Sequence, residues 1–226
     1  MPSLTRDELV TRVGLLVEDP SNVRWDSTTK ISLLNQWQDR FVLDTRALTD
    51  VASSSVVAGT QEYDLPSDIL STVRVVLNGI ELRQTGKVDI DDNTNSDWTQ
   101  TTGQPHSYYI DLDPDNLKIG LYPVPTAAEA GSSNLKIEYT KQPTALSASS
   151  SVPFNSHTLL GLYGEALAYG CAYQLLLTDP TPENLARAAR YLSEYGVYVA
   201  KAINNFRAMR QRKPLRLRGG RFFRGR

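Results

Sequence analysis

The chain has 226 residues, of which 40 % are hydrophobic and 22 % are charged, so it can bury a sizeable core as one large domain or two small ones. No apolar run approaches the roughly 18 residues of a transmembrane candidate, and the acidic first residues are unlike a signal peptide, so we expect a soluble protein without membrane association. The single cysteine, Cys171, excludes an intramolecular disulfide framework and a multi-cysteine metal site.

The charge is distributed unevenly along the chain. Nine of the 24 Lys and Arg residues lie in residues 207–226, a segment without any acid, while the whole chain has a net charge of −1. Residues 1–206 therefore hold 15 bases against 25 acids, a net charge of −10. This asymmetry predicts an acidic body that carries a strongly basic tail.

Residues 1–49 are predicted to form the first half of a helical domain. The first helix has Ser3 as its N-cap candidate, with apolar residues at helical spacing behind it. The second helix can be capped by Ser27 or Thr28, and its apolar stripe runs to about Leu48.

Residues 50–151 are predicted to form an inserted β domain, because short alternating runs rich in Thr, Val and Tyr are separated by turn residues. The dipeptide Asn78-Gly79 is a strong hairpin signal, and residues 113–116 supply a second turn. Residues 134–139 alternate cleanly between apolar and polar types. We expect five or six antiparallel strands in a small sandwich or curled sheet.

Residues 152–206 are predicted to complete the helical domain. One helix should run from about Ser156 to Leu177, and the last helix should run from Pro182 through Phe206. The predicted fold class is α+β: an antiparallel four-helix body interrupted by an antiparallel β-sandwich-like insert, with an extended C-terminal basic tail.

The tail, residues 207–226, mixes arginines with leucine and phenylalanine, and its Pro and Gly-Gly oppose a long helix. We predict that it becomes ordered on a partner, with apolar anchors and with Arg as a ligand of carboxylates or phosphates; the alternative is a solvated tail. The predicted partner-docking residues are Arg212, Lys213, Leu215, Arg216, Leu217, Arg218, Arg221, Phe222, Phe223, Arg224 and Arg226.

Small residues recur at helical spacing in the predicted third helix, at Gly161, Gly164, Ala168 and Ala172. An internal glycine costs a helix about 1 kcal/mol relative to alanine, so such a face indicates that another backbone lies close by. Close packing within the helical body and contact with a neighbouring subunit both fit this pattern.

Catalytic and metal-binding patterns are nearly absent from the sequence. His106 and His157 lie in different parts of the chain, and Cys171 lies on an apolar helix, where packed thiols are usually inert. The acidic residues 89–97 match a calcium loop in composition only, without its central glycine and terminal glutamate; we expect a solvated loop. We predict no enzymatic activity, cofactor or metal.

Several turn and strand phrases occur in a characteristic order over roughly residues 30–200. They are residues 58–68 (AGTQEYDLPSD), 103–105 (GQP), 121–125 (LYPVP) and 137–139 (IEY). Their order and spacing resemble the head-to-tail adaptor proteins of tailed bacteriophages.

The resemblance implies a structural ring, usually of twelve copies, between the portal protein and a tail-side neck or tail protein, in the virion at the head–tail interface. The protein would be made in the host cytoplasm, and double-stranded DNA would pass through the ring without specific binding. In several such adaptors a C-terminal segment inserts into the portal, so the basic tail is expected to dock there. An acidic body would repel DNA in the channel.

Two other functions are compatible with the sequence. The first is a nucleic-acid-binding protein that uses the basic tail, with an affinity that falls steeply with salt. The second is a receptor- or glycan-binding tail component with Tyr63, Trp98, Tyr108 and Tyr109 as an aromatic platform. The acidic body argues against the first, and the strand positions of the tyrosines argue against the second.

Overall fold

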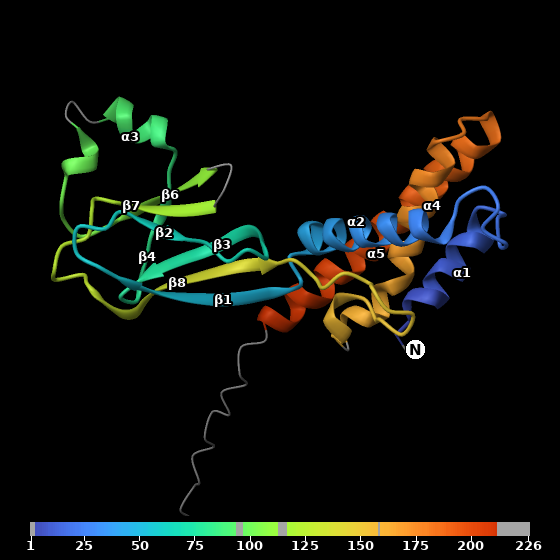
Figure 1. The fold of residues 1–226 in the computed structure, drawn as a ribbon, viewed down its shortest axis with the longest axis horizontal. Coiled ribbons are helices and arrows are strands. Elements are labelled where there is room, and N and C mark those ends of the chain that lie inside the picture. Colours follow the sequence, from blue (N-terminus) through green and yellow to red (C-terminus); the bar gives the residue numbers. More distant parts are fainter. Residues whose placement is uncertain (1–2, 94–96, 113–116, 158, 212–226) are drawn as a thin grey trace, which may run out of the picture.

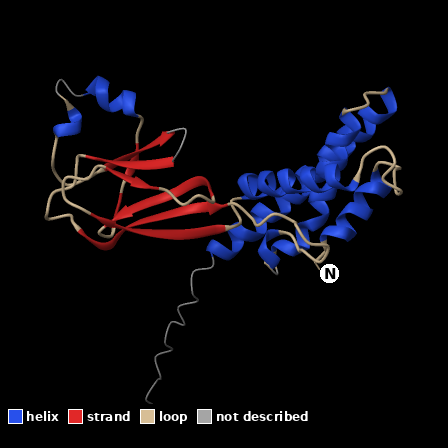
Figure 2. Cartoon of the chain, in the orientation of Figure 1, coloured by secondary structure: helices blue, strands red, loops and turns tan. Residues whose placement is uncertain are grey.

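The computed structural model describes residues 3–93, 97–112, 117–157 and 159–211. The chain is α+β, as predicted from the sequence, with most helices gathered at one end of an elongated molecule and two four-stranded sheets at the other (Figure 1 and Figure 2).

The helical end contains α1 (Arg6–Leu16), α2 (Ser27–Thr45), α4 (Gly164–Leu177) and α5 (Pro182–Gln211). Helix α4 contacts the other three, so segments from both ends of the sequence share one core. Fully buried members of that core include Leu9, Val13, Leu34, Phe41, Leu160, Leu167, Cys171 and Ala202. Two of these helices precede the β segment and two follow it.

The caps of the first two helices differ from our expectation. Thr5 rather than Ser3 caps α1, because its hydroxyl accepts from the Glu8 amide while the Glu8 carboxylate accepts from the Thr5 amide. Asp26 caps α2 in place of Ser27 or Thr28, since its carboxylate accepts from the Thr29 amide at 2.6 Å. The left-handed Arg46 ends α2 before Leu48.

The later helices also differ in their limits. The expected start at Ser156 is wrong, because the 3₁₀ turns Phe154–Ser156 and Leu160–Tyr163 precede α4. Helix α5 continues past Phe206 to Gln211. Its last residues therefore belong to the segment for which we predicted an extended, nonhelical conformation. Good helix formers fill residues 208–211, and the first proline beyond α5 is Pro214.

The sheets hold eight strands in the described part of the chain, rather than five or six. The first sheet has the order β1 (Thr49–Val56), β8 (Gly131–Lys141), β3 (Ile69–Leu77), β4 (Ile80–Glu81). The second has the order β2 (Glu62–Asp64), β7 (Leu117–Tyr122), β6 (Ser107–Leu112), β5 (Arg83–Gln84), and its β5–β6 pair is parallel. Both sheets contribute to one core, which includes Val75, Leu77, Tyr108, Ile119, Leu121, Leu135 and Ile137.

The strand pairs of both predicted hairpins are confirmed. Asn78 and Gly79 have φ values of 49° and 84° between paired Leu77 and Ile80, as a tight two-residue turn requires. In the second hairpin β6 pairs antiparallel with β7, while its turn at 113–116 lies outside the described residues.

The expected alternation in β8 is also present. Leu135, Ile137 and Tyr139 are buried, while Lys136 between them is exposed. One face of this central strand therefore meets the core, and the other faces solvent.

The segment after β5 covers part of the second sheet. Residues 89–93, which we expected in a solvated loop, belong to α3 (Lys87–Asn93), and the 3₁₀ turn Trp98–Gln100 comes after it. Trp98 packs edge-on against Tyr109, with ring centroids 5.6 Å apart, and Tyr109 lies across Gly120, where a Cβ atom would overlap its ring. These aromatic contacts attach the segment after β5 to the second sheet, and the prediction of a solvated loop did not include them.

Helix α2 holds the segment that returns from the β strands. Asn35 and Gln38 lie three residues apart on one face of α2. Asn35 Oδ1 accepts from the Leu146 amide at 2.8 Å, and buried Gln38 bridges the Thr144 carbonyl (3.0 Å) and the Phe154 amide (2.9 Å). These bonds satisfy backbone groups that the segment would otherwise bury without partners.

Gly170→Ala should destabilise the protein by about 1 to 3 kcal/mol, because the added methyl would overlap the Trp37 ring, which packs between Tyr173 and Tyr195. The matched control is Gly196→Ala, where nothing lies within 4 Å of the new Cβ; it should stabilise α5 by up to about 1 kcal/mol. Urea unfolding of both variants measures the difference. Equal effects would contradict the packing argument.

Candidate functional site

The candidate reactive residues do not come together. His106 Nδ1 lies 2.9 Å from the neighbouring Ser107 hydroxyl, and His157 belongs to the turn before α4. Cys171 is fully buried, and burial raises the pKa of its thiol to about 12. Within the described residues no three His, Cys, Asp or Glu side chains form a group that could hold a metal ion. No helix in that part of the chain is long and apolar enough to cross a membrane.

The aromatic platform is not assembled on the surface. Tyr108 and Tyr109 are 4 % and 1 % exposed, respectively, because they lie on opposite faces of β6 and are both covered. The Tyr63 hydroxyl donates to the Thr60 carbonyl at 2.8 Å, within its own turn. These tyrosines therefore stabilise the β half.

The predicted partner-docking residues, from Arg212 to Arg226, all lie outside the described residues.

The predicted small-residue face lies within the described part of the chain. Ala168 and Ala172 are fully buried in the helical core. Gly161 lies against Ser3, where a Cβ atom would overlap the hydroxyl, and Gly164 is near Leu4. The N-terminal segment of the same chain thus passes over both glycines, and subunit contact at these positions stays a prediction.

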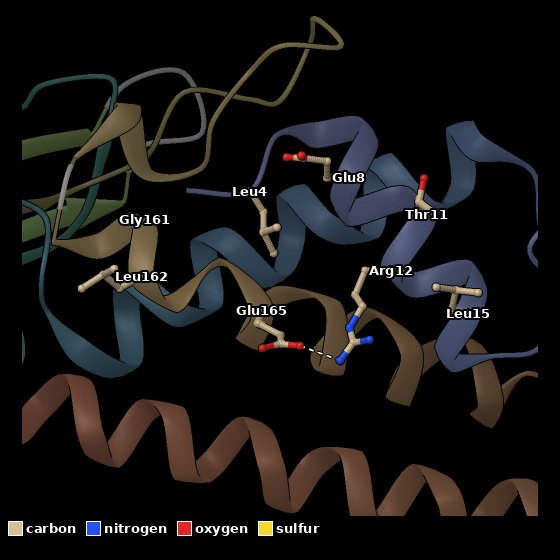
Figure 3. A pocket seen from close by; sticks show the side chains of 8 residues that line it. All are labelled: Leu4, Glu8, Thr11, Arg12, Leu15, Gly161, Leu162 and Glu165. Carbon is tan, nitrogen blue, oxygen red and sulfur yellow. Dashed lines mark hydrogen bonds and ion pairs between the residues drawn. The ribbon is translucent and has the colours of Figure 1, made fainter. Parts of the chain in front are cut away.

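A groove of about 380 Å³ opens between α1 and the start of α4 (Figure 3). We call it the α1–α4 groove, and it is lined by Leu4, Glu8, Thr11, Arg12, Leu15, Gly161, Leu162 and Glu165. Leu15 is 58 % exposed and Leu162 is 49 % exposed. The groove thus presents apolar side chains to solvent.

An ion pair spans this groove. Arg12 Nη2 lies 2.6 Å from Glu165 Oε1, and the Tyr198 hydroxyl of α5 donates to Glu165 Oε2 at 3.1 Å. The hydrogen bond with Glu165 raises the pKa of Arg12, and burial together with Glu165 raises the pKa of Tyr198 to about 12. The arrangement ties α1, α4 and α5 together and fixes the groove's shape.

One acid at the rim of the groove is Glu8. It lies in the first turn of α1 and is exposed, while its neighbour Asp7 is paired with Arg6 at 2.9 Å. Hydrogen bonds from Thr5 lower the pKa of Glu8, so its carboxylate is charged at neutral pH. The groove therefore combines exposed leucines with negative charge, which suits an apolar partner with a basic edge.

A second groove, of about 360 Å³, lies between α2 and α4 and is lined by Gln36, Trp37, Asp39, Arg40, Leu43 and Gln174. Most of these side chains are polar. The α1–α4 groove is the more apolar of the two surfaces.

Reasoning from the sequence missed the α1–α4 groove. Its walls come from residues about 150 positions apart, which periodicity cannot join. One signal was present: Leu15 lies off the buried line of Leu9 and Val13, and a leucine there is exposed in an amphipathic helix.

Comparison with known proteins gives one result that covers both halves of the chain. A family model described as SU10 adaptor protein matches residues 4–219. No curated protein matches the sequence.

Proposed function

This chain belongs to the SU10 adaptor protein family, and we propose that it forms a structural ring between the portal and the tail of a tailed bacteriophage. The family makes it a phage adaptor-type protein and a virion component. In our proposal the role is structural, without catalysis. The observation that carries it is the family match, which extends over both the helical and the β halves and into the basic tail.

The architecture supports contact with two different partners. The helical core and the β core are separate, and the chain passes between them through neighbouring strands, with Thr49 paired to Thr140. In the proposed ring, the helices act as one antiparallel four-helix body facing the portal, and the sheets act as a sandwich facing the tail. Twelve copies is the number that the resemblance to head-to-tail adaptors implies.

The charge of the chain supports a channel for double-stranded DNA. Residues 1–206 have a net charge of −10, so a lumen lined by this body repels the phosphate backbone during passage. A lumen lined mainly by Lys and Arg would contradict this orientation.

Deleting Arg212 to Arg226 should leave a folded protein that no longer assembles on portal rings, because the basic and apolar tail is the proposed portal-docking segment. The test is a pull-down with purified portal rings, followed by negative-stain imaging of full-length and truncated protein. Full-length protein should add a ring to the portal and the truncated form should not. Loss of the fold on truncation would contradict the proposed role of the tail.

Two controls make this experiment specific. The double variant Phe222→Ala with Phe223→Ala keeps every charge of the tail. It should weaken docking by about 2 to 4 kcal/mol if the two phenylalanine side chains are anchors buried in the portal. Double-stranded DNA, offered over a range of salt concentrations, tests the nucleic-acid alternative. Salt-dependent retention of DNA without portal binding would replace the adaptor proposal.

A further inference from the structure

One side of α5 exposes a line of apolar residues. Its members are Leu185, Ala189, Leu192, Gly196 and Ala200, which we call the outer face of α5. Leu185 is 45 % exposed and Leu192 is 41 % exposed. The spacing of four, three, four and four residues places all five on one narrow line about 22 Å long.

Gly196 is unexplained by packing within the chain. A glycine inside a helix costs about 1 kcal/mol relative to alanine. Gly170 has an intramolecular reason, because Trp37 lies on it, but a Cβ atom at Gly196 would meet nothing within 4 Å. A glycine on an exposed apolar line leaves room for a second backbone to approach closely.

The outer face of α5 points away from the α1–α4 groove. Tyr191 donates to the Leu16 carbonyl at the end of α1 (2.9 Å), and Tyr198 donates to Glu165 in the groove. These tyrosines mark the groove side of α5. Residues two apart in an α-helix point about 200° apart, so Ala189 opposes Tyr191, and Gly196 opposes Tyr198.

We propose that the outer face of α5 in one copy docks into the α1–α4 groove of the next copy in the ring. The inference rests on the proposed function. Two different surfaces that point in opposite directions give a head-to-tail contact, the kind that can close into a ring. Leu192 would cover Leu15 of the neighbour, and Gly196 would let the helices approach.

A basic residue continues this line toward the C-terminal end of α5. Arg207 is exposed and lies about three helical turns beyond Gly196, on the same side of the helix. Glu8, the acid at the rim of the groove, is near the N-terminal end of α1. Arg207 and Glu8 carry opposite charges, which favours pairing of the two surfaces at this end.

The heights of the paired residues agree with this contact. Within one chain, α5 runs antiparallel to α1, because Tyr191 meets Leu16 while Asn205 donates to Tyr163 at 2.6 Å, near the start of α4. If the ring axis is parallel to α5, rotation from one copy to the next leaves each residue's position along the axis, its height, unchanged. Leu192 then lies level with Leu15, because each is one residue away from the contact between Tyr191 and Leu16. Arg207 lies toward the end of the groove that Leu162 marks, because Asn205 contacts Tyr163.

A crosslinking experiment tests this pairing. Leu15→Cys and Leu192→Cys are introduced together into the full chain, whose native Cys171 is fully buried. A bismaleimide with a flexible spacer is added to the free protein and to the protein bound on portal rings. The double variant should give a ladder of dimers, trimers and larger products on a denaturing gel, because each copy then links to two neighbours. The matched control pairs Leu15→Cys with Val88→Cys, at the exposed Val88 of α3.

The outcomes separate this inference from the proposed function. A ring on the portal without a ladder would overturn the inference and leave the adaptor role standing. A ladder in a protein that never binds portal rings would support the contact and count against the adaptor role. A ladder from the control pair alone would also overturn the contact. So would the absence of a ladder from the Leu15→Cys, Leu192→Cys variant both in the free protein and on portal rings.

A substitution at Gly196 gives an independent readout. Gly196→Leu should weaken association between copies by about tenfold or more, because the side chain fills the space left for the neighbour. It should leave the fold intact, since that space is open within the chain. Val88→Leu is the control for added bulk at an exposed position. Unchanged association of Gly196→Leu in sedimentation would overturn the close approach.

Discussion

Replacing Lys30 with methionine should lower the free energy of unfolding by about 3 to 5 kcal/mol. Lys30 is fully buried, and its ammonium donates to the Asp19 carbonyl (3.0 Å), the Asp19 carboxylate (3.1 Å) and Asn22 Oδ1 (2.7 Å). Methionine fills a similar volume but leaves the nearly buried Asp19 carboxylate without its cation. Removing one partner of a buried ion pair leaves the other charge uncompensated, and this destabilises the protein by more than the new apolar contacts stabilise it.

Acid should weaken the same contact. Burial opposes ionisation of Asp19, but hydrogen bonds from the Trp25 amide, Lys30 and the Val23 and Arg24 amides lower its pKa from 3.8 to about 2. Because the folded pKa lies below the unfolded value, the stabilisation is present above about pH 4 and is lost as pH falls toward 2. In Lys30→Met one of these bonds is missing, so the loss should begin at higher pH.

Guanidinium unfolding at neutral pH and along an acid series measures both effects. The matched control is Lys136→Met, because Lys136 is exposed on β8; it should change stability by less than about 0.5 kcal/mol. A loss below about 1 kcal/mol in Lys30→Met would show that the contact is not a major source of stability.

Phe41→Ala should destabilise the protein by about 3 to 5 kcal/mol, because the ring is fully buried where separate parts of the chain meet. Its centroid lies 5.2 Å from Phe154 in the return segment, 5.8 Å from Tyr163 before α4 and 6.2 Å from Tyr195 in α5. Truncation leaves a cavity that rigid neighbours cannot fill and removes the aromatic contacts.

The control for this substitution lies on the same helix. Leu43→Ala removes a side chain that is 40 % exposed, two residues along α2, and should cost less than about 1 kcal/mol. Urea unfolding compares the two. Similar losses in both variants would mean that Phe41 is not a junction between the segments.

The helix order and the two hairpins followed from the sequence because they rest on local rules. Asn78-Gly79 predicts its turn from the φ values that the two residues tolerate, and the alternation at residues 134–139 predicts which face of β8 is buried. The expected starts at Ser3 and Ser156 failed, because Thr5 has a partner in Glu8 and 3₁₀ turns precede α4. Helix ends depend on which donor finds a partner, and periodicity does not report this.

The order of the amino acids was enough to predict the α+β class, the acidic body with its basic tail, and the resemblance to head-to-tail adaptors, which the family match confirms in its adaptor part. It was not enough to predict that Lys30 is an interior cation, because a lysine in an amphipathic helix ordinarily faces water. The α1–α4 groove likewise depends on residues far apart in the chain. Their proximity follows from how the helices pack, which no local pattern encodes.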